Sequence, residues 1–151
     1  MKNVKVICMH FNELSTLELY EILKLRNEVF CVEQNCAYQD LDGKDEQCWH
    51  VRVFNENGLI GYARLVPENI SYNKHTSIGR VVISQSMRKR GLGKMLMRES
   101  IEHLISLAGR KPIMISAQTY LLNFYKSFGF NSIGEEYPED GIPHIKMILG
   151  K

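Results

Sequence analysis

The spacing of apolar positions changes several times along the chain, and each spacing predicts a different element. Residues 4–10 are mostly apolar and predict a first strand. The capping box at 15–18, which reads Ser-Thr-Leu-Glu, begins a helix whose apolar positions recur at helical spacing to about Phe30. Residues 31–48 are polar and irregular, and a loop of that length in a compact domain is more often functional than not.

The middle of the chain predicts three strands and a helix. Residues 49–54 and 59–66 have the composition of strands, and the turn at 55–58, which ends in Asn-Gly, is a strong hairpin signal. Residues 76–84 form the next predicted strand. A helix with one apolar face is expected over 95–108.

The last third of the chain predicts two further pieces of sheet around a short helix. We expect a buried strand over 112–117, a helix over 119–128, and a closing pair of strands at 132–136 and 144–149. The resulting order, β-α-loop-β-β-β-α-β-α-β-β, predicts an α/β (mixed α+β) fold with helices on both faces of a mixed sheet. The length of 151 residues suits a single domain over the whole chain.

Composition narrows the class of protein. Hydrophobic content of 44% and charged content of 24% are ordinary for a soluble globular protein. The net charge of +2 is too small to indicate a nucleic-acid partner. No apolar run is long enough to span a bilayer, and the first residues lack a small-residue cleavage site, so we expect a cytoplasmic protein with no membrane partner.

Four cysteines are present, and we expect them to be reduced thiols. None forms a Cys-x-x-Cys pair. Three of them together with His50 are ligand types that zinc accepts, but their spacing matches no common zinc ribbon, and we expect no metal. The cysteines are Cys8, Cys31, Cys36 and Cys48.

A basic, glycine-containing turn separates the predicted strand at 76–84 from the predicted helix. A helix start offers unpaired N–H groups and about half a positive charge, and glycines let the backbone approach a ligand, so this turn predicts an anion site. Neither a Walker loop nor a dinucleotide fingerprint fits, because Met95 replaces the Walker hydroxyl and the third fingerprint glycine is absent. The turn consists of Arg88, Lys89, Arg90, Gly91, Leu92, Gly93 and Lys94.

This turn fits the pattern Arg/Gln-x-x-Gly-x-Gly/Ala and resembles the acyl-CoA pyrophosphate loop of the GNAT N-acetyltransferases. The resemblance implies the GNAT fold, a mixed, mostly antiparallel twisted sheet with a splay between its two central strands. It implies acetyl-CoA as cosubstrate, with the backbone of Val81, Val82 and Ile83 bonding the pantetheine arm inside the splay. The N–H near Val82 would then polarise the thioester carbonyl.

A second segment, 123–130, reads Asn-Phe-Tyr-Lys-Ser-Phe-Gly-Phe and resembles the FY-x-x-x-GF element of the same family. Tyr125 falls at the position that often protonates the departing CoA thiolate in that family. A phenol is neutral at pH 7 and can serve as a general acid. Gln118 and Asn123 are candidate contacts to the pantetheine under the same resemblance.

Further segments resemble the ElaA-like subgroup of the family, and the resemblance covers nearly the whole chain from about residue 17. They are 25–36, 40–45, Gly79-Arg80-Val81-Val82 and 139–145. The subgroup implies acyl-transfer chemistry without an identified acceptor. Residues 26–30, the acidic loop and 64–67 also resemble the acyl-homoserine-lactone synthases, which share the fold but are usually longer.

The general base is the weak point of this assignment. Many relatives place a carboxylate on the strand before the basic turn, whereas this strand has no Asp or Glu. We take His50, whose reference pKa suits proton transfer at neutral pH, and Glu33 as working candidates. Charge alone suggests that the acidic loop binds a cationic acceptor, such as a polyamine or a lysine. The full set of candidate bases is Glu33, Asp40, Asp42, His50 and His144.

The sequence therefore predicts an N-acetyltransferase that passes an acetyl group from acetyl-CoA to a primary amine of a small molecule or peptide in a ternary complex. Its partners would be acetyl-CoA and the amine, with a homodimer left open. Two other interpretations remain. One is a non-catalytic acyl-CoA-binding module, which the missing carboxylate favours, and the other is a zinc-stabilised interaction module built on the cysteine loop.

Overall fold

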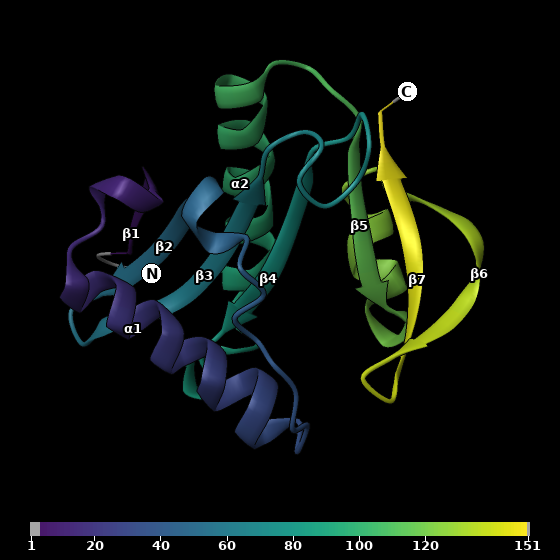
Figure 1. Ribbon diagram of the computed structural model, residues 1–151. Helices are drawn as coiled ribbons and strands as arrows, with labels where there is room; N and C mark the ends of the chain where they lie inside the picture. The colour runs from purple at the N-terminus through teal and green to yellow at the C-terminus, as the bar shows by residue number, and fades with distance from the viewer. Residues whose placement is uncertain (1–3, 151) are drawn as a thin grey trace.

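The computed structural model describes residues 4–150, which form two antiparallel sheets that lie side by side (Figure 1). The first sheet has the strand order β1-β2-β3-β4, and the second has the order β5-β7-β6. The strands are β1 Lys5–His10, β2 Trp49–Asn55, β3 Gly58–Val66, β4 Ser77–Ile83, β5 Ile113–Gln118, β6 Asn131–Glu139 and β7 Ile142–Leu149.

Helices cover both faces of the first sheet (Figure 1), which confirms the predicted fold class. The alternation of side chains along β3 explains the arrangement. Tyr62 packs with Ile22 of α1, whereas Ala63 and Leu65 point to the opposite face and belong to the larger core that includes α2. The short α3 packs against β5. The helices are α1 Thr16–Arg26, α2 Leu92–Ala108 and α3 Leu122–Lys126.

The two sheets meet at one end of β4 and β5. Thr76, just before β4, donates its N–H to Pro112 O at 3.1 Å and accepts from Met114 N–H at 2.9 Å. Beyond this point the two strands diverge (Figure 1). Arg80 has a left-handed backbone, with φ of 51°, where the β3–β4 register shifts, and such a bulge bends the strand. The splay that the family resemblance implies is confirmed.

Some helix boundaries differ from the prediction. α1 ends at Arg26 and continues as a π-helical segment, Asn27–Glu33, which uses part of the predicted loop. α2 begins at Leu92 rather than at Met95, because the left-handed glycine before Leu92 already turns the chain into the helix. The helix predicted over 119–128 is a 3-10 turn followed by the shorter α3.

The hairpin between β6 and β7 is tighter than predicted. We expected β6 to end at Glu136, but it continues to Glu139. Asp140 and Gly141 both have positive φ, 51° and 78°, and a two-residue turn of this kind keeps the strands paired up to the turn itself. Pro138 is tolerated inside β6 because β6 is an edge strand. This extension places more of β6 beside the site described next.

Candidate functional site

The basic turn lies at the start of α2, where the backbone is arranged for an anion. Gly91 is the N-cap residue, with φ of 77°, and no side chain caps the helix. Met95 N–H is bonded to Gly91 O at 3.1 Å, so the amides before Met95 have no acceptor within the helix. Lys89 also has a left-handed backbone, with φ of 61°. Unpaired N–H groups and cations therefore gather at this helix start.

A cavity of about 880 Å³ opens between the two sheets beside this helix start. Its volume lies within the range of about 300–1,000 Å³ that is typical of ligand sites. One side is formed by β4 and the start of α2, and the other by β5, α3 and the β6–β7 hairpin. Of the residues predicted to bind the cosubstrate, those that line it are Val81, Val82, Ile83, Arg88, Lys89, Leu92, Gly93, Gln118 and Tyr125.

The strand register decides which amides of β4 face the cavity. Ser84 N–H is bonded to Ile60 O of β3 at 2.8 Å, and Val82 is paired with Tyr62. Backbone groups alternate in direction along a strand, so those of Val82 point to β3, and those of Val81 and Ile83 point away from it, into the splay. The structure therefore directs the amides of Val81 and Ile83, and not the amide of Val82, into the splay.

Arg88 and Glu33, both predicted site residues, form an ion pair at the rim of the cavity. The Arg88 guanidinium donates to the two Glu33 carboxylate oxygens at 2.5 and 2.8 Å, and its Nε donates to Ile83 O at 3.0 Å. The hydrogen bond from Arg88 holds the pKa of Glu33 below its usual value. Glu33 is thus a weaker base than a free carboxylate.

Tyr125 lies in the wall of the cavity with its ring packed in the core. Its ring makes edge-to-face contacts with Phe124 and Phe130, at centroid distances of 5.1 and 6.1 Å. Burial, and to a lesser extent Tyr120, raises the pKa of Tyr125 to about 12. The phenol therefore remains protonated at neutral pH and can donate a proton to a group in the cavity.

The other predicted cosubstrate contacts lie outside the cavity wall. Arg90, Gly91 and Lys94 are exposed at the start of α2, where they can approach a phosphate from solvent. Asn123 is exposed on α3, and its carbonyl accepts from Ser127 N–H at 3.2 Å. The structure therefore does not bring the Asn123 side chain to the cavity, whereas Gln118 does line it.

His50 is enclosed in the core and does not line the cavity. Its Nδ1 lies 2.8 Å from Tyr62 Oη and its Nε2 lies 3.0 Å from Asp45 O. Because a carbonyl only accepts, Nε2 carries the hydrogen and Nδ1 accepts from the tyrosine. Burial lowers the pKa of His50 to about 4. The structure thus contradicts the choice of His50 as base, since both ring nitrogens are occupied away from any acceptor.

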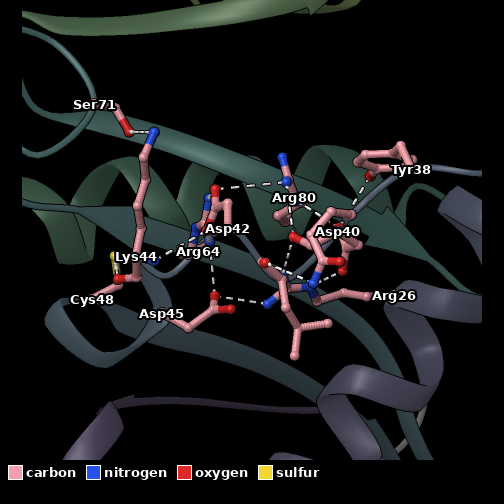
Figure 2. Close-up of polar contacts among 12 residues, drawn as sticks. Arg26, Tyr38, Asp40, Asp42, Lys44, Asp45, Cys48, Arg64, Ser71 and Arg80 are labelled. Carbon is pink, nitrogen blue, oxygen red and sulfur yellow. Dashed lines mark hydrogen bonds and ion pairs between the residues drawn. The ribbon is translucent and has the colours of Figure 1, made fainter. Parts of the chain in front are cut away.

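The acidic loop is used by a network of ion pairs, which we call the charge ring (Figure 2). Asp40 pairs with Arg26 at 2.8 Å and with Arg80 at 2.7 Å. Asp45 also pairs with Arg26, at 2.7 Å. Three cations and three carboxylates alternate around it, so its formal charges cancel. Its members are Arg26, Asp40, Arg80, Asp42, Arg64 and Asp45.

The charge ring closes through Arg64 and Asp42. Arg64 lies 2.8 Å from Asp45 and 2.7 Å from Asp42, and Arg80 lies 3.6 Å from Asp42. Burial raises the pKa of Asp45, but the hydrogen bonds and charge of Arg26 and Arg64 outweigh this and hold the pKa below its usual value. Three carboxylates of the acidic loop, those of Asp40, Asp42 and Asp45, therefore already have cationic partners, which leaves them less available to a cationic acceptor.

Sequence reasoning missed a polar cluster on the second sheet. Ser116, Tyr137 and Glu139 are joined by hydrogen bonds and lie beside His144 on the face of the sheet that looks into the cavity. The period-two alternation of β6 could have revealed Tyr137 and Glu139. That signal was lost because β6 was expected to end at Glu136.

The four cysteines are free thiols. Cys48 donates to Lys44 O at 3.0 Å, and Cys36 to Asp140 O at 3.4 Å. Across residues 4–150, no group of three His, Cys, Asp or Glu side chains is arranged to hold a metal ion, and no helix is both long and apolar enough to cross a membrane.

Comparisons with known proteins agree with this geometry. The family model of the acetyltransferase (GNAT) domain matches residues 15–151. Protein ElaA of Escherichia coli K12 is 42% identical over 92% of each chain, and a UPF0039 protein of Schizosaccharomyces pombe is 41% identical over 99% of each.

Two solved structures are also closely similar to this chain. An acyl-CoA N-acyltransferase from Pseudomonas aeruginosa superposes with a TM-score of 0.92 at 38% identity, and Escherichia coli ElaA with 0.91 at 39%. Both matches cover 97% of this chain and 99% of the other. The resemblance to the ElaA-like subgroup is confirmed.

Proposed function

The chain belongs to the GNAT acetyltransferase family, and from that premise we propose that it transfers an acetyl group from acetyl-CoA to a primary amine of a small molecule or peptide. The transfer is direct, within a ternary complex. The observation that carries the proposal is the uncapped start of α2, with its left-handed glycine, beside the cavity that separates β4 from β5. Unpaired amides suit the pyrophosphate, and the splay suits the extended pantetheine arm.

The reaction needs two changes at the carbonyl carbon: a C–N bond forms and the C–S bond breaks. The carbonyl oxygen gains negative charge as the amine attacks, and the amides of Val81 and Ile83 that point into the splay would stabilise it. The departing thiolate then takes a proton from Tyr125, which remains protonated at neutral pH.

The charge of the cosubstrate would be met by the basic turn. Lys89, Arg90 and Lys94 surround the free amides at the start of α2. Arg88 would exchange the carboxylate of Glu33 for phosphate oxygens, since the planar guanidinium can donate two hydrogen bonds to either anion. The proposal therefore assigns Arg88 a second partner that appears only with the cosubstrate.

Thermal unfolding with separately added acetyl-CoA, CoA, ATP and NAD tests the donor site. A ligand that binds only the folded state at about 100 times its dissociation constant adds roughly 2.7 kcal/mol to the free energy of unfolding, which raises the midpoint. We expect a rise with acetyl-CoA and CoA alone. No rise with either CoA ligand would overturn the proposal.

A second measurement separates an enzyme from a binding module. Release of free CoA from acetyl-CoA is followed with a thiol reagent while single primary amines are added. We expect amine-dependent release for at least one of them. Tight binding of acetyl-CoA without amine-dependent release would instead favour the non-catalytic module.

A further inference from the structure

The two faces of the second sheet differ in character. Side chains alternate between the two faces along β7, and those of Ile145 and Met147 pack in the core. His144 directly precedes Ile145, so its side chain points to the opposite face. On that face His144 stands next to Gln118 in the β5–β7 ladder and next to Tyr137 in the β6–β7 ladder. Because β5 borders the splay, the imidazole lies one strand away from the gap.

The hydrogen bonds of His144 leave one ring nitrogen available to the cavity. Nδ1 lies 2.7 Å from Ile142 O, and because a carbonyl only accepts, Nδ1 must carry the hydrogen of the neutral ring. Nε2 is then the unprotonated nitrogen, and it has no hydrogen-bond partner within residues 4–150. Only 9% of the residue is exposed, and it lines the cavity. The residue as a whole is largely enclosed, but Nε2 remains accessible, so this nitrogen can accept a proton from a ligand bound in the cavity.

Tyr137 and Glu139, which lie on the same face as His144, make this part of the cavity wall suitable for a cation. The Tyr137 ring stacks on the His144 ring, with centroids 6.2 Å apart and planes 28° apart, which fixes the imidazole. Ser116 Oγ donates to Glu139 Oε2 at 2.7 Å and lies 2.5 Å from Tyr137 Oη. The second carboxylate oxygen of Glu139 has no partner among the residues that the structure describes, and no cation pairs with it there.

We propose that this face is the acceptor subsite, in which Glu139 receives the protonated amine and His144 Nε2 removes a proton from it before attack on the thioester. The inference rests on the proposed function, of which it supplies the missing base. The protonated amine loses one proton to Nε2 and forms the C–N bond as the C–S bond breaks. The thiolate takes a proton from Tyr125, and the second proton that the amine nitrogen loses returns to the Tyr125 phenolate, so one proton in total is released, to His144. His144 is left as an imidazolium, stabilised by its bond to Ile142 O.

The alternatives for the base are already occupied. Glu33 is held by Arg88, and Asp42 belongs to the charge ring. His50 has both nitrogens bonded inside the core. Among the predicted candidates that line the cavity, His144 is thus the one that no ion pair holds in the residues described.

The first test is the tautomer of His144, read from long-range ¹⁵N–¹H correlation NMR of histidine-labelled protein. We expect the Nδ1–H form. His75, whose Nδ1 lies 2.6 Å from Asn73 O, provides a reference for that form, and His50 provides the opposite one. A protonated Nε2 in neutral His144 would overturn the proposal, because no lone pair would then face the cavity.

The second test compares two acceptors, propylamine, which is protonated at pH 7, and methoxyamine, which is not. A lost base slows only the first, so His144→Gln should reduce turnover of propylamine by about 10²-fold or more and that of methoxyamine only a few-fold. Glu139→Gln should raise KM for propylamine more than it lowers kcat. Equal loss on both amines in His144→Gln would show a merely structural role.

His75→Gln is the matched control, because it removes a histidine with the same local carbonyl bond but outside the cavity wall. Its rates should equal those of the unmodified protein. Binding of acetyl-CoA separates the two levels of proposal. If His144→Gln binds acetyl-CoA normally and fails only with propylamine, the proposed function and the acceptor subsite are both supported. If the unmodified protein does not bind acetyl-CoA, the proposed function is overturned, and the tautomer of His144 is then judged by itself.

Discussion

At the scale of single residues, the hydroxyl of Tyr125 is the group whose removal is most informative. Tyr125→Phe keeps the ring contacts with Phe124 and Phe130, so the fold and acetyl-CoA affinity should be retained. Turnover should fall by about 10²- to 10⁴-fold, the usual contribution of a general acid. Steady-state CoA release and thermal shift with CoA check the two halves of this prediction, and full activity would return Tyr125 to a packing role.

His50 makes a residue-scale prediction about pH. Its folded-state pKa of about 4 lies below the value of about 6.5 expected in the unfolded chain, so the unfolded chain binds more protons between these values. Stability should therefore fall as pH drops from 6.5 towards 4, by no more than about 3 kcal/mol from this group. Urea unfolding at several pH values should show a shallower fall for His50→Gln. Parallel curves for the two proteins would contradict the prediction.

At the scale of elements, the charge ring ties the acidic loop to α1, β3 and β4. Asp40→Asn would leave Arg26, which is fully buried, without one of its two carboxylates. Removing one partner of a buried pair costs about 3–5 kcal/mol, so the free energy of unfolding in urea should fall by that order. Glu28→Gln is the control, because the Glu28–Lys24 pair is exposed and 4.0 Å long, and it should change stability by less than about 0.5 kcal/mol.

The start of α2 makes a prediction about close approach. A Cβ at Gly93 would meet Phe124 at 3.8 Å, an ordinary contact, so Gly93→Ala should fold with unchanged or slightly higher stability. The added methyl group lies where a phosphate would approach the backbone, and we expect acetyl-CoA affinity to fall about tenfold or more, about 1.4 kcal/mol. Arg98→Ala, further along α2, is the control for calorimetry. Equal affinities in the two variants would argue against the anion site.

The elements that sequence reasoning predicted well are those with local signals. The capping box of Ser15 and Glu18 forms as expected, with bonds of 3.2 and 2.8 Å, and the hairpin turn lies between Asn55 and Gly58. The errors lie where contacts between distant parts of the chain determine the local structure. The π-helical segment ends at Glu33, which pairs with Arg88, and Arg80 in the bulge pairs with Asp40. These contacts join parts of the chain far apart in sequence, and no local pattern contains them.

At the scale of the whole molecule, the distinction between local motifs and distant contacts explains which parts of the candidate site could be predicted from the sequence. The positions of the basic turn and of Tyr125 beside the cavity could be predicted because each lies in a short motif. His144 was only one of several candidate bases, because the role that we propose for it depends on Ile142 O, on Tyr137 and on the position of the second sheet beside the cavity. His50 was misassigned for the converse reason, since its enclosure between Tyr62 and Asp45 is visible only in three dimensions.

The division into two sheets leads to a prediction about amide exchange. The sheets are hydrogen-bonded to each other at Thr76, and further along β4 the amides of Val81 and Ile83 point into the gap. Acetyl-CoA bound in the splay would bond to these amides, so hydrogen exchange at Val81 and Ile83 should slow by more than that in β1 and β2. Mass spectrometry of overlapping peptides measures this difference. Equal slowing in all strands would indicate general stabilisation by a ligand bound elsewhere, whereas slowing concentrated at β4, β5 and the start of α2 would mean that the cosubstrate bridges the two sheets.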